Sequence, residues 1–435
     1  MTDKSTGITR AVPAGKADLE ARRRQAKKAV VAASIGNGLE WFDVVVYGSF
    51  AVTISALFFP SNNATVSLLV GFGTFGISFL MRPLGGIIIG RYADRAGRKA
   101  GMMVSISLMF IGTVLIAFSP TAQMIGIAAA VILIFARLLQ GFAAGGEFGT
   151  ATAFLIEHAP NRRAFYASWQ VATQGVALLL AGIFGFVLNS YLSTQALNSW
   201  GWRVPFIFAL LIGPVGFYIR AKMADTPEFL ASTPSKSPLK ETLVDNIGRL
   251  LTIIGVVALG SVGIYIALFM PSYAITKLGM PAGAAFVSTL VFGVIMSIGS
   301  PFVGILADRF GPAKLMTIAA VGTVVLGIPM FVLLIHTPTL PTIIGIELVL
   351  GVLATLYFAP LPAIMSSMFP VQIRTTGLSL GYNIGVTVFG GFAPFILIYL
   401  IDKTGSLLVP GFYLAAIAAL SFVSLVVARR RYTQR

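Results

Sequence analysis

The first apolar stretch of the chain carries four polar side chains, Asn37, Glu40, Asp43 and Tyr47, and the carboxyl groups of Glu40 and Asp43 could bind and release a proton. Offsets of three and four residues place them on one face of a helix. An ionisable side chain at bilayer depth costs at least about 2.5 kcal/mol, so it normally faces a cavity or a partner. We therefore expect the two carboxyl groups to face the interior of the protein.

Basic and amide side chains occupy the later apolar stretches. Arg137, Gln140 and Glu147 share one helical face at offsets of 0, 3 and 10 residues. Glu147 then lies about 15 Å along the helix from Arg137, at 1.5 Å per residue. The segment FLMRPLGG (79–86) contributes Arg82. The apolar stretch 163–191 adds three further polar side chains, which are Gln170, Thr173 and Gln174.

The expected depths of these residues suggest two charge systems. One joins Asp43 to Arg137, and the other joins Arg82 to Glu40 or Glu147. Three acids then face two bases, so one carboxyl has no permanent basic partner. Burial without a partner disfavours the ionised form of a carboxyl, which makes such a group a candidate proton carrier. The alternative for each single residue is a purely structural role in locking helices together.

The composition indicates a membrane protein as the framework for these residues. Hydrophobic residues make up 57% of the 435 residues and charged residues 11%, whereas soluble domains carry about 25% charge. Apolar stretches of spanning length predict an all-α fold with twelve transmembrane helices. Their expected ranges are 29–59, 64–92, 100–119, 122–157, 163–191, 203–221, 247–276, 282–307, 313–336, 339–368, 371–401 and 407–428.

A duplicated turn divides these helices into two sets of six. The sequence GRYADRAGRKAG (90–101) returns 214 positions later as GILADRFGPAKL (304–315), and such repetition in an apolar chain is typical of transporters built from repeated bundles. The sequence therefore predicts five regions: a basic tail (1–28), a first six-helix bundle (29–222), a linker (223–246), a second six-helix bundle (247–428) and a basic C-terminal tail (429–435).

The distribution of Lys and Arg predicts the orientation. Residues 1–28 hold eight of them and 91–99 hold four, whereas the loops on the opposite side hold only Lys277 and Lys403. Because cytoplasmic loops carry the excess of Lys and Arg, we expect both termini and the linker in the cytoplasm. The net charge of +16 is thus a topology signal and an attraction to anionic lipid, not a nucleic-acid site.

Each copy of the turn could form a latch between the bundles. Asp94 falls at the end of a helix, where the macrodipole disfavours an anion, so it needs a neighbouring arginine or the N-terminus of a helix from the other bundle. A glycine in each copy permits the tight turn. The second copy has fewer basic residues, which predicts a weaker latch. The latch candidates are Asp94, Arg95, Gly97 and Arg98 in the first copy, and Asp308, Arg309 and Gly311 in the second.

The second half is poorer in polar side chains, so we expect it to supply mainly the wall opposite the proton site. Glu347 lies near the start of a helix, and we expect it in the membrane interface. Tyr and Ser residues here fit helix packing better than ligand binding. The polar candidates are Tyr265, Ser297, Ser300, Glu347, Tyr357, Tyr382 and Asn383. Across both halves we expect the substrate to contact Arg82, Tyr47, Gln140, Gln170, Gln174, Tyr265, Tyr382 and Asn383.

Several long motifs resemble the metabolite:proton symporter family of the major facilitator superfamily, over essentially the whole chain. They are GNGLEWFDVVVYG (36–48), FLMRPLGG (79–86), RLLQGFAAGGEFG (137–149), FYASWQ (165–170) and WGWRVPF (200–206). The resemblance implies proton-coupled uptake of a small polar metabolite across a bacterial inner membrane, with substrates such as α-ketoglutarate, citrate, shikimate, proline or glycine betaine. It also implies that Asp43, Arg137 and Glu147 serve proton coupling, and that Arg82 and Arg203 lie near the path or its gate.

We expect an organic acid as substrate, because an arginine can neutralise a carboxylate. A proline or betaine symporter and a proton-coupled drug exporter are the alternatives with the same fold. The chain has no HExxH or phosphate-loop motif, so we expect no enzymatic activity. We further expect a monomeric functional unit that binds its substrate, protons and membrane lipid, with no cofactor other than the proton and no metal site.

Overall fold

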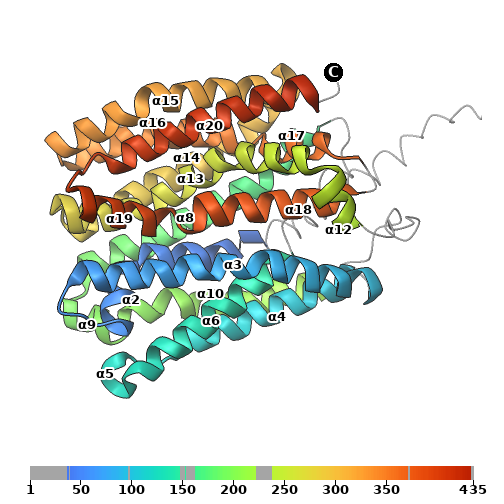
Figure 1. Cartoon of the computed structure of the whole chain (residues 1–435). Coiled ribbons are helices and arrows are strands. Elements are labelled where there is room, and N and C mark those ends of the chain that lie inside the picture. Colours follow the sequence, from blue (N-terminus) through green and yellow to red (C-terminus); the bar gives the residue numbers. More distant parts are fainter. Residues whose placement is uncertain are drawn as a thin grey trace, which may run out of the picture.

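A computed structural model describes residues 37–38, 40–96, 98–146, 152, 162–221, 238–370 and 373–432, and for residues 93–95, 98, 219–221, 238, 374 and 375 it describes the backbone only. The tail 1–28, Gly97 and Glu147 lie outside the described residues. The described chain forms a bundle of long helices that run side by side (Figure 1). Helices satisfy every backbone group within one segment, which is the requirement that hydrocarbon imposes on a spanning chain.

The first half begins with a helical segment, Glu40–Ser49. The elements that follow it are α2 (Ala51–Phe58), α3 (Ala64–Ala96), α4 (Arg98–Ala117), α5 (Ala122–Ile125), α6 (Ile127–Gly145), α8 (Arg163–Tyr191), α9 (Thr194–Ser199), the 3-10 turn η1 (Gly201–Arg203) and α10 (Val204–Ala221).

The second half repeats this arrangement. Its elements are α12 (Pro238–Lys240), the π-helical turn η2 (Glu241–Asp245), α13 (Ile247–Leu278), α14 (Ala282–Phe310), α15 (Pro312–His336), α16 (Leu340–Phe358), α17 (Leu361–Met368), α18 (Arg374–Gly385), the π-helical segment η4 (Val386–Gly391), α19 (Ala393–Thr404) and α20 (Val409–Arg431).

The described part of the chain has eleven helices long and apolar enough to cross a membrane, and twelve when the bent pair Glu40–Ser49 and Ala51–Phe58 is counted as one span. This confirms the predicted all-α fold with twelve spans. The first span is bent by 72° between its two parts, which the sequence analysis did not predict. Gly48 and Ser49 stand at the bend, and a Gly/Ser pair is a recognised cause of sharp kinks.

Two other predicted ranges differ from the structure, and one predicted break is confirmed. The range 122–157 is not one continuous helix, because Gly126 with φ +62° separates α5 from α6 and α6 ends at Gly145. The linker 223–246 is helical in its last part, over α12 and η2. The break expected from Pro360 and Pro362 is present, since α16 ends at Phe358 and α17 begins at Leu361.

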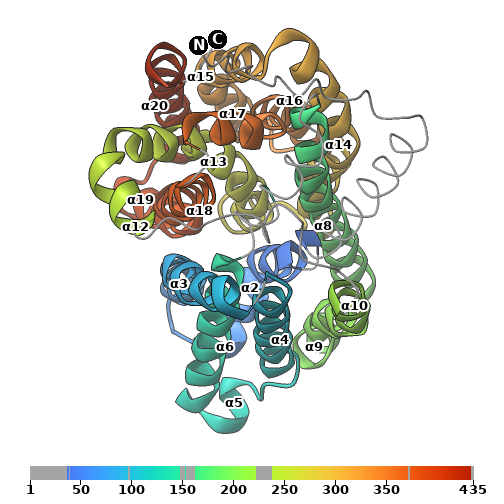
Figure 2. The ribbon, with the colours of Figure 1, turned by 90° about the vertical axis from the view of Figure 1, so that its right-hand side faces the viewer.

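Most helices before residue 222 pack among themselves, as do most of those after residue 237, whereas α8 packs chiefly against α14 of the other group, and two seams join the two groups. In one seam α8 lies along α14, and in the other α3 lies along α18, η4 and α19. Figure 2 shows the two groups end on, with α8 beside α14. Gly175 and Gly293 make the first seam close, because a Cβ at either position would lie 2.3–2.4 Å from a backbone nitrogen of the other helix.

We call the end of the bundle that carries α12 and α17 the basic end, and the end that carries α5, α9 and the α19–α20 turn the far end (Figure 1). Basic side chains gather at the first of these, including Lys99, Arg163, Lys314 and the Arg429–Arg431 run that closes α20. The first span runs toward the far end, where α2 lies (Figure 1). Glu40 is therefore nearer the basic end than Asp43.

Candidate functional site

Asp43 is buried inside the first half, with 4% of its surface exposed. Its Oδ2 atom accepts a hydrogen bond of 2.5 Å from the Thr113 hydroxyl of α4. Its Oδ1 atom has no hydrogen-bond partner among the described residues. A buried carboxyl with one free oxygen in a membrane-spanning segment has the properties of a proton-binding group.

Asp43 and Arg137 belong to one network, but two side chains separate them. The Arg137 guanidinium donates from Nη1 to Gln140 Oε1 at 2.7 Å, and Gln140 Nε2 donates to Thr113 Oγ1 at 3.1 Å. Thr113 then completes the chain to Asp43. The described structure therefore joins the two ions that were predicted to pair through Thr113 and Gln140 instead of by direct contact.

The Arg137 guanidinium, 1% exposed, is fixed by rings as well as by hydrogen bonds. It lies over the Tyr47 ring at 4.4 Å and the Phe75 ring at 5.4 Å, and its Nη2 donates to Ser78 Oγ at 3.4 Å. Cation–π contacts of this kind strengthen when they are desolvated. Tyr47, which was predicted as a substrate contact, thus positions the arginine and donates its own hydroxyl to the Gly71 carbonyl.

Arg82 and Glu40 form the second charge pair, nearer the basic end. Arg82 Nη2 lies 3.9 Å from Glu40 Oε1, and both side chains are almost fully buried. Of the two partners that the sequence left open for Arg82, the structure shows Glu40. Arg82 also lies 4.3 Å above the Phe79 ring, so the charges rest on an aromatic surface.

Aromatic rings from both halves meet beside this pair. The Tyr265 ring of α13 lies 5.5 Å from Phe79, 5.9 Å from Phe75 and 6.2 Å from Trp41. Its hydroxyl is buried without a hydrogen-bond partner in the described part of the chain, and its ring meets the Phe79 ring, over which the Arg82 guanidinium lies. Tyr382 of α18 is buried as well, with 1% of its surface exposed. Of the two predicted tyrosines, the structure therefore places Tyr265 beside the charges.

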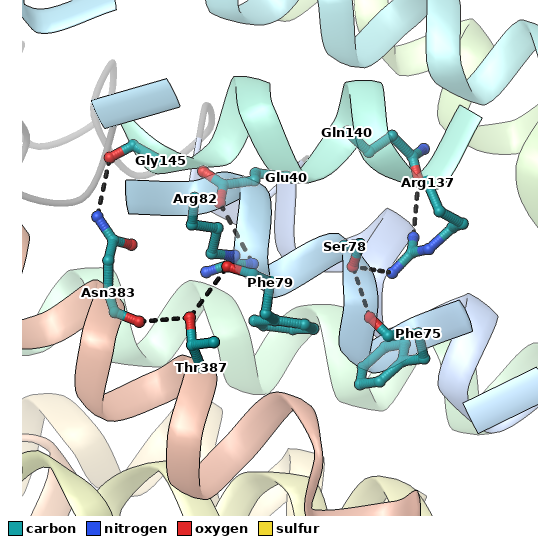
Figure 3. Close-up of polar contacts among 10 residues, drawn as sticks. All are labelled: Glu40, Phe75, Ser78, Phe79, Arg82, Arg137, Gln140, Gly145, Asn383 and Thr387. Atoms are coloured by element: carbon teal, nitrogen blue, oxygen red, sulfur yellow. Dashed lines mark hydrogen bonds and ion pairs between the residues drawn. The ribbon is translucent and has the colours of Figure 1, made fainter. Parts of the chain in front are cut away.

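Helix α18 and the following η4 make polar contacts across the interface of the two halves (Figure 3). Asn383 donates to the Gly145 carbonyl of α6 at 3.0 Å, and Thr387 donates to the Phe79 carbonyl of α3 at 3.0 Å. The Asn383 Oδ1 atom has no partner among the described residues. Asn383 thus lies at the predicted site, and it joins the halves on the basic-end side of Arg82.

The two glutamines of α8 form a neighbouring polar group. The Gln170 carbonyl accepts from Asn37 Nδ2 at 2.8 Å, and the Gln170 Oε1 atom accepts from Thr152 at 3.0 Å. Gln174 is fully buried, and neither of its amide atoms has a partner in the described structure. A buried amide without a partner retains its full capacity to bind a polar ligand.

Asp308 of the second half contacts the first half. Its carboxylate, near the end of α14, accepts from the backbone N–H groups of Ala164 and Phe165 at 2.9 and 3.0 Å. These residues begin α8, so a carboxylate of the second half rests on the positive end of a first-half helix. Gly311 with φ +92° makes the turn that follows, and the Arg309 guanidinium lies over the Phe310 ring at 5.3 Å.

Most of the other gate candidates lie outside the described residues. The side chains of Asp94, Arg95 and Arg98, with Gly97 and Glu147, lie outside the described residues, so the relative strength of the two latches stays a prediction. Arg203 lies at the far end, away from the charged pairs. It donates to the Ser199 and Ser119 carbonyls at 2.6 and 2.9 Å and covers Trp202.

The remaining second-half candidates are structural, with one correction. Tyr357 donates to the Val256 carbonyl and Ser300 to the Met296 carbonyl, as expected for packing residues, and Ser297 donates to the Val294 carbonyl of its own helix. Glu347, predicted in the membrane interface, is instead 0% exposed. Because α16 turns this side chain toward the bundle interior, both carboxyl oxygens are buried without a partner in the described structure.

Sequence reasoning missed Thr113, Ser78 and Thr387. Each is a neutral hydroxyl in an apolar helix, and such residues commonly bond only to their own backbone. The one available signal was position: Thr113 lies well inside the range predicted for the third helix, at the expected depth of Asp43.

Comparisons with known proteins agree with this architecture. The family model of the Major Facilitator Superfamily matches residues 38–385 and 281–434. The chain is 34% identical to a citrate-proton symporter of Klebsiella pneumoniae over 410 residues, which cover 93% of this chain and 92% of the relative. It is 32% identical to a proline/betaine transporter of Escherichia coli K12 over 414 residues, with 92% and 82% covered.

Solved structures show the same fold at lower identity. A D-xylose-proton symporter superposes with a TM-score of 0.75 at 16% identity, over 94% of this chain and 98% of that one. The xylose transporter XylE of E. coli, in a partially occluded inward open conformation, gives a TM-score of 0.72 at 17% identity, with 93% and 97% covered.

Proposed function

Because this chain belongs to the Major Facilitator Superfamily, we propose that the buried carboxyl of Asp43 couples proton influx to the uptake of a small metabolite. The chain is a multi-pass protein of a bacterial inner membrane and a proton-coupled symporter. One observation carries the assignment of Asp43: a buried carboxyl with a free oxygen is connected through Thr113 and Gln140 to a buried arginine.

The substrate class that best fits the charges is an organic acid. Arg137 and Arg82 lie in membrane-spanning helices, and a buried guanidinium binds a carboxylate through charge-assisted hydrogen bonds. Glu40 already balances Arg82, so Arg137 is the guanidinium that protonation of Asp43 would leave without a counter-charge. The citrate-proton symporter among the relatives supports this choice.

A betaine or proline is the second candidate, and a separate observation favours it. Trp41, Phe75, Phe79 and Tyr265 form an aromatic cluster beside the charges, and aromatic faces recognise quaternary ammonium groups. A zwitterion would place its carboxylate on an arginine and its ammonium group against these rings. The proline/betaine transporter among the relatives is consistent with this reading.

Alternating access follows from the two halves rocking about this central layer, with the predicted bundles 29–222 and 247–428 as the moving bodies. The excess of Lys and Arg at the basic end supports a cytoplasmic location for that end. The Asp308 contact to α8 would then close the cytoplasmic side in one state and open in the other. The cycle needs no cofactor and makes or breaks no bond of the substrate, since the proton is the coupling ion and one chain holds the whole site.

Transport in vesicles tests the proposal. Purified protein is reconstituted, a pH gradient (acid outside) is imposed, and uptake of labelled citrate, proline and glycine betaine is measured. We expect accumulation of one class above its equilibrium level. Influx of one net positive charge provides about 2.3 kcal/mol per 100 mV, which corresponds to roughly 50-fold accumulation. Drug export without gradient-driven uptake would contradict the proposal.

The Asp43→Asn variant tests the role of the carboxyl. Asparagine keeps the size and accepts the Thr113 hydrogen bond, but it cannot take up a proton. We expect gradient-driven accumulation to fall to the equilibrium level, while exchange of labelled for unlabelled substrate continues. Asp402→Asn, an exposed acid in α19, is the control and is expected to accumulate substrate like the wild type. Full accumulation by Asp43→Asn would refute the assignment.

A further inference from the structure

We propose that Thr113 is a proton-dependent switch between Asp43 and Arg137: its hydroxyl donates to the ionised carboxylate, and it turns to the Met109 carbonyl when Asp43 carries a proton. The inference rests on the proposed function, because it takes Asp43 as the coupling site. Thr113 acts here as a positioning residue, since it does not contact the substrate.

The geometry around Thr113 allows two hydrogen-bond states. Its Oγ1 atom lies 2.5 Å from Asp43 Oδ2, 3.0 Å from the Met109 carbonyl and 3.1 Å from Gln140 Nε2. A hydroxyl has one hydrogen and two lone pairs. The Gln140 amide is a donor and occupies one lone pair, so the single hydroxyl hydrogen can serve either Asp43 or Met109, and not both fully.

In the ionised state every donor points from the arginine toward the carboxylate. Arg137 donates to Gln140, Gln140 donates to Thr113, and Thr113 donates to Asp43. Hydrogen bonds aligned in this way polarise one another in a low-dielectric interior. The negative charge of Asp43 therefore stabilises the guanidinium of Arg137 across two neutral side chains.

Proton binding reverses the direction of the hydrogen bond between Thr113 and Asp43. A proton from the outer solution joins Asp43 Oδ2, the new O–H donates to the free lone pair of Thr113 Oγ1, and the Thr113 hydrogen rotates to the Met109 carbonyl. Every donor and acceptor of the ionised state remains paired, and no covalent bond other than the new O–H changes. Arg137 loses its counter-charge, which leaves its guanidinium available to a substrate carboxylate.

The other ionisable groups that the structure describes around this network come from four elements. Arg137 of α6 lies over the Tyr47 ring of the first span, and Arg82 of α3 lies over the Phe79 ring that Tyr265 of α13 contacts. Glu40 is held by Arg82. In the described part of α4 the ionisable side chain is Lys99, at the basic end four turns away from Thr113. Asp43 is thus the acid that Thr113 contacts.

Infrared titration of the reconstituted protein tests the switch without any substrate. The carboxylic acid C=O band is followed as the pH is lowered, and the wild-type spectrum minus the Asp43→Asn spectrum isolates Asp43. Thr113→Val keeps the shape of the side chain and removes the donor to the carboxylate. Because that donor favours the ionised form, its loss should move the midpoint of the Asp43 band upward by about 1–2 pH units.

The controls separate this inference from the proposed function. Thr113→Ser keeps the hydroxyl and should titrate like the wild type. If the valine side chain disturbs the packing, Thr113→Ala is used in place of Thr113→Val, because it also removes the hydroxyl and its side chain is smaller. If Asp43→Asn removes no titrating band, the proposed proton site itself is wrong. If the band is present and neither Thr113→Val nor Thr113→Ala moves its midpoint or its frequency, the switch is overturned while the proton site stands.

Discussion

At the scale of single residues, two of the buried acids that the structure describes have opposite environments. Asp43 has a donor in Thr113, and Gln140 connects that donor to Arg137. Glu347 has no hydrogen-bond partner in the described structure, although it is completely buried. The proposed coupling role therefore rests on the network around Asp43, and no described contact joins Glu347 to that network.

Replacing Glu347 by Leu should stabilise the protein. A buried polar group without a hydrogen bond costs about 1–3 kcal/mol, and the substitution removes that cost while keeping an apolar volume. We expect a higher thermal unfolding midpoint in detergent and normal uptake in vesicles. Asp402→Leu, at an exposed site, should give no such gain. Loss of uptake in Glu347→Leu at normal abundance would show that this acid is used in transport.

The sequence identified the charged residues because an ion in an apolar helix is expensive wherever it lies. It could place Asp43 and Arg137 at one depth, but it could not show that Gln140 and Thr113 stand between them. That detail depends on the rotation of α4 and α6 about their axes, which neutral residues in neighbouring helices determine. For the same reason Glu347 was assigned to the wrong surface.

At the scale of helices, α3 and α6 hold the two arginines in place through backbone contact. A Cβ atom at Gly141 would lie 1.8 Å from the Ser78 carbonyl oxygen, and one at Gly145 would lie 1.8 Å from the Arg82 carbonyl oxygen. Small residues at such crossings let two membrane helices approach closely. Here the approach brings Arg137 of α6 to Ser78 of α3.

Gly141→Ala should therefore separate α3 from α6. Overpacking costs about 1–3 kcal/mol or more, and we expect a lower unfolding midpoint together with reduced uptake. Gly90→Ala, in α3 of this helix pair, is the matched control, because no atom of the described residues lies within 4 Å of its added Cβ, and alanine is the better helix former. Equal stability of the two variants would mean that the close crossing is absent from the folded protein.

The helices themselves were predictable because a run of about twenty apolar residues has one stable form in a bilayer. Breaks caused by proline, as at Pro360, were also predictable. The 72° bend of the first span and the Gly126 interruption were not. Glycine permits such bends without requiring them, so the tertiary packing decides where they occur.

At the scale of the whole molecule, the Asp308 contact to the start of α8 joins the two halves at the basic end. The duplicated turn predicted a latch of this kind, and a helix of the other half was one of the two partners considered for Asp94. The structure shows that partner for Asp308 in the second copy. Repetition in the sequence pointed to Asp308, whereas its partner required the arrangement of the two halves, and the latch itself stays a prediction.

Asp308→Asn should loosen the basic end. The neutral amide loses the charge-assisted hydrogen bonds to the α8 N-terminus, which are roughly twice as strong as neutral ones. The chain has no cysteine, so a Ser168→Cys substitution introduces a single thiol. Ser168 of α8 lies against Gly304 of α14, and labelling of this thiol measures how easily a reagent reaches the contact of the two helices. We expect faster labelling by a thiol reagent in Asp308→Asn, with Asp402→Asn as the control. Unchanged labelling would contradict the latch.

The central claim is that the Asp43 carboxyl carries the coupled proton, and substrate-driven proton flux measures it most directly. Vesicles in weakly buffered medium receive the substrate that the uptake panel identifies, and the external pH is recorded. The account predicts external alkalinisation with the wild type and none with Asp43→Asn, although that variant still exchanges substrate. Alkalinisation of wild-type size with Asp43→Asn would contradict the account.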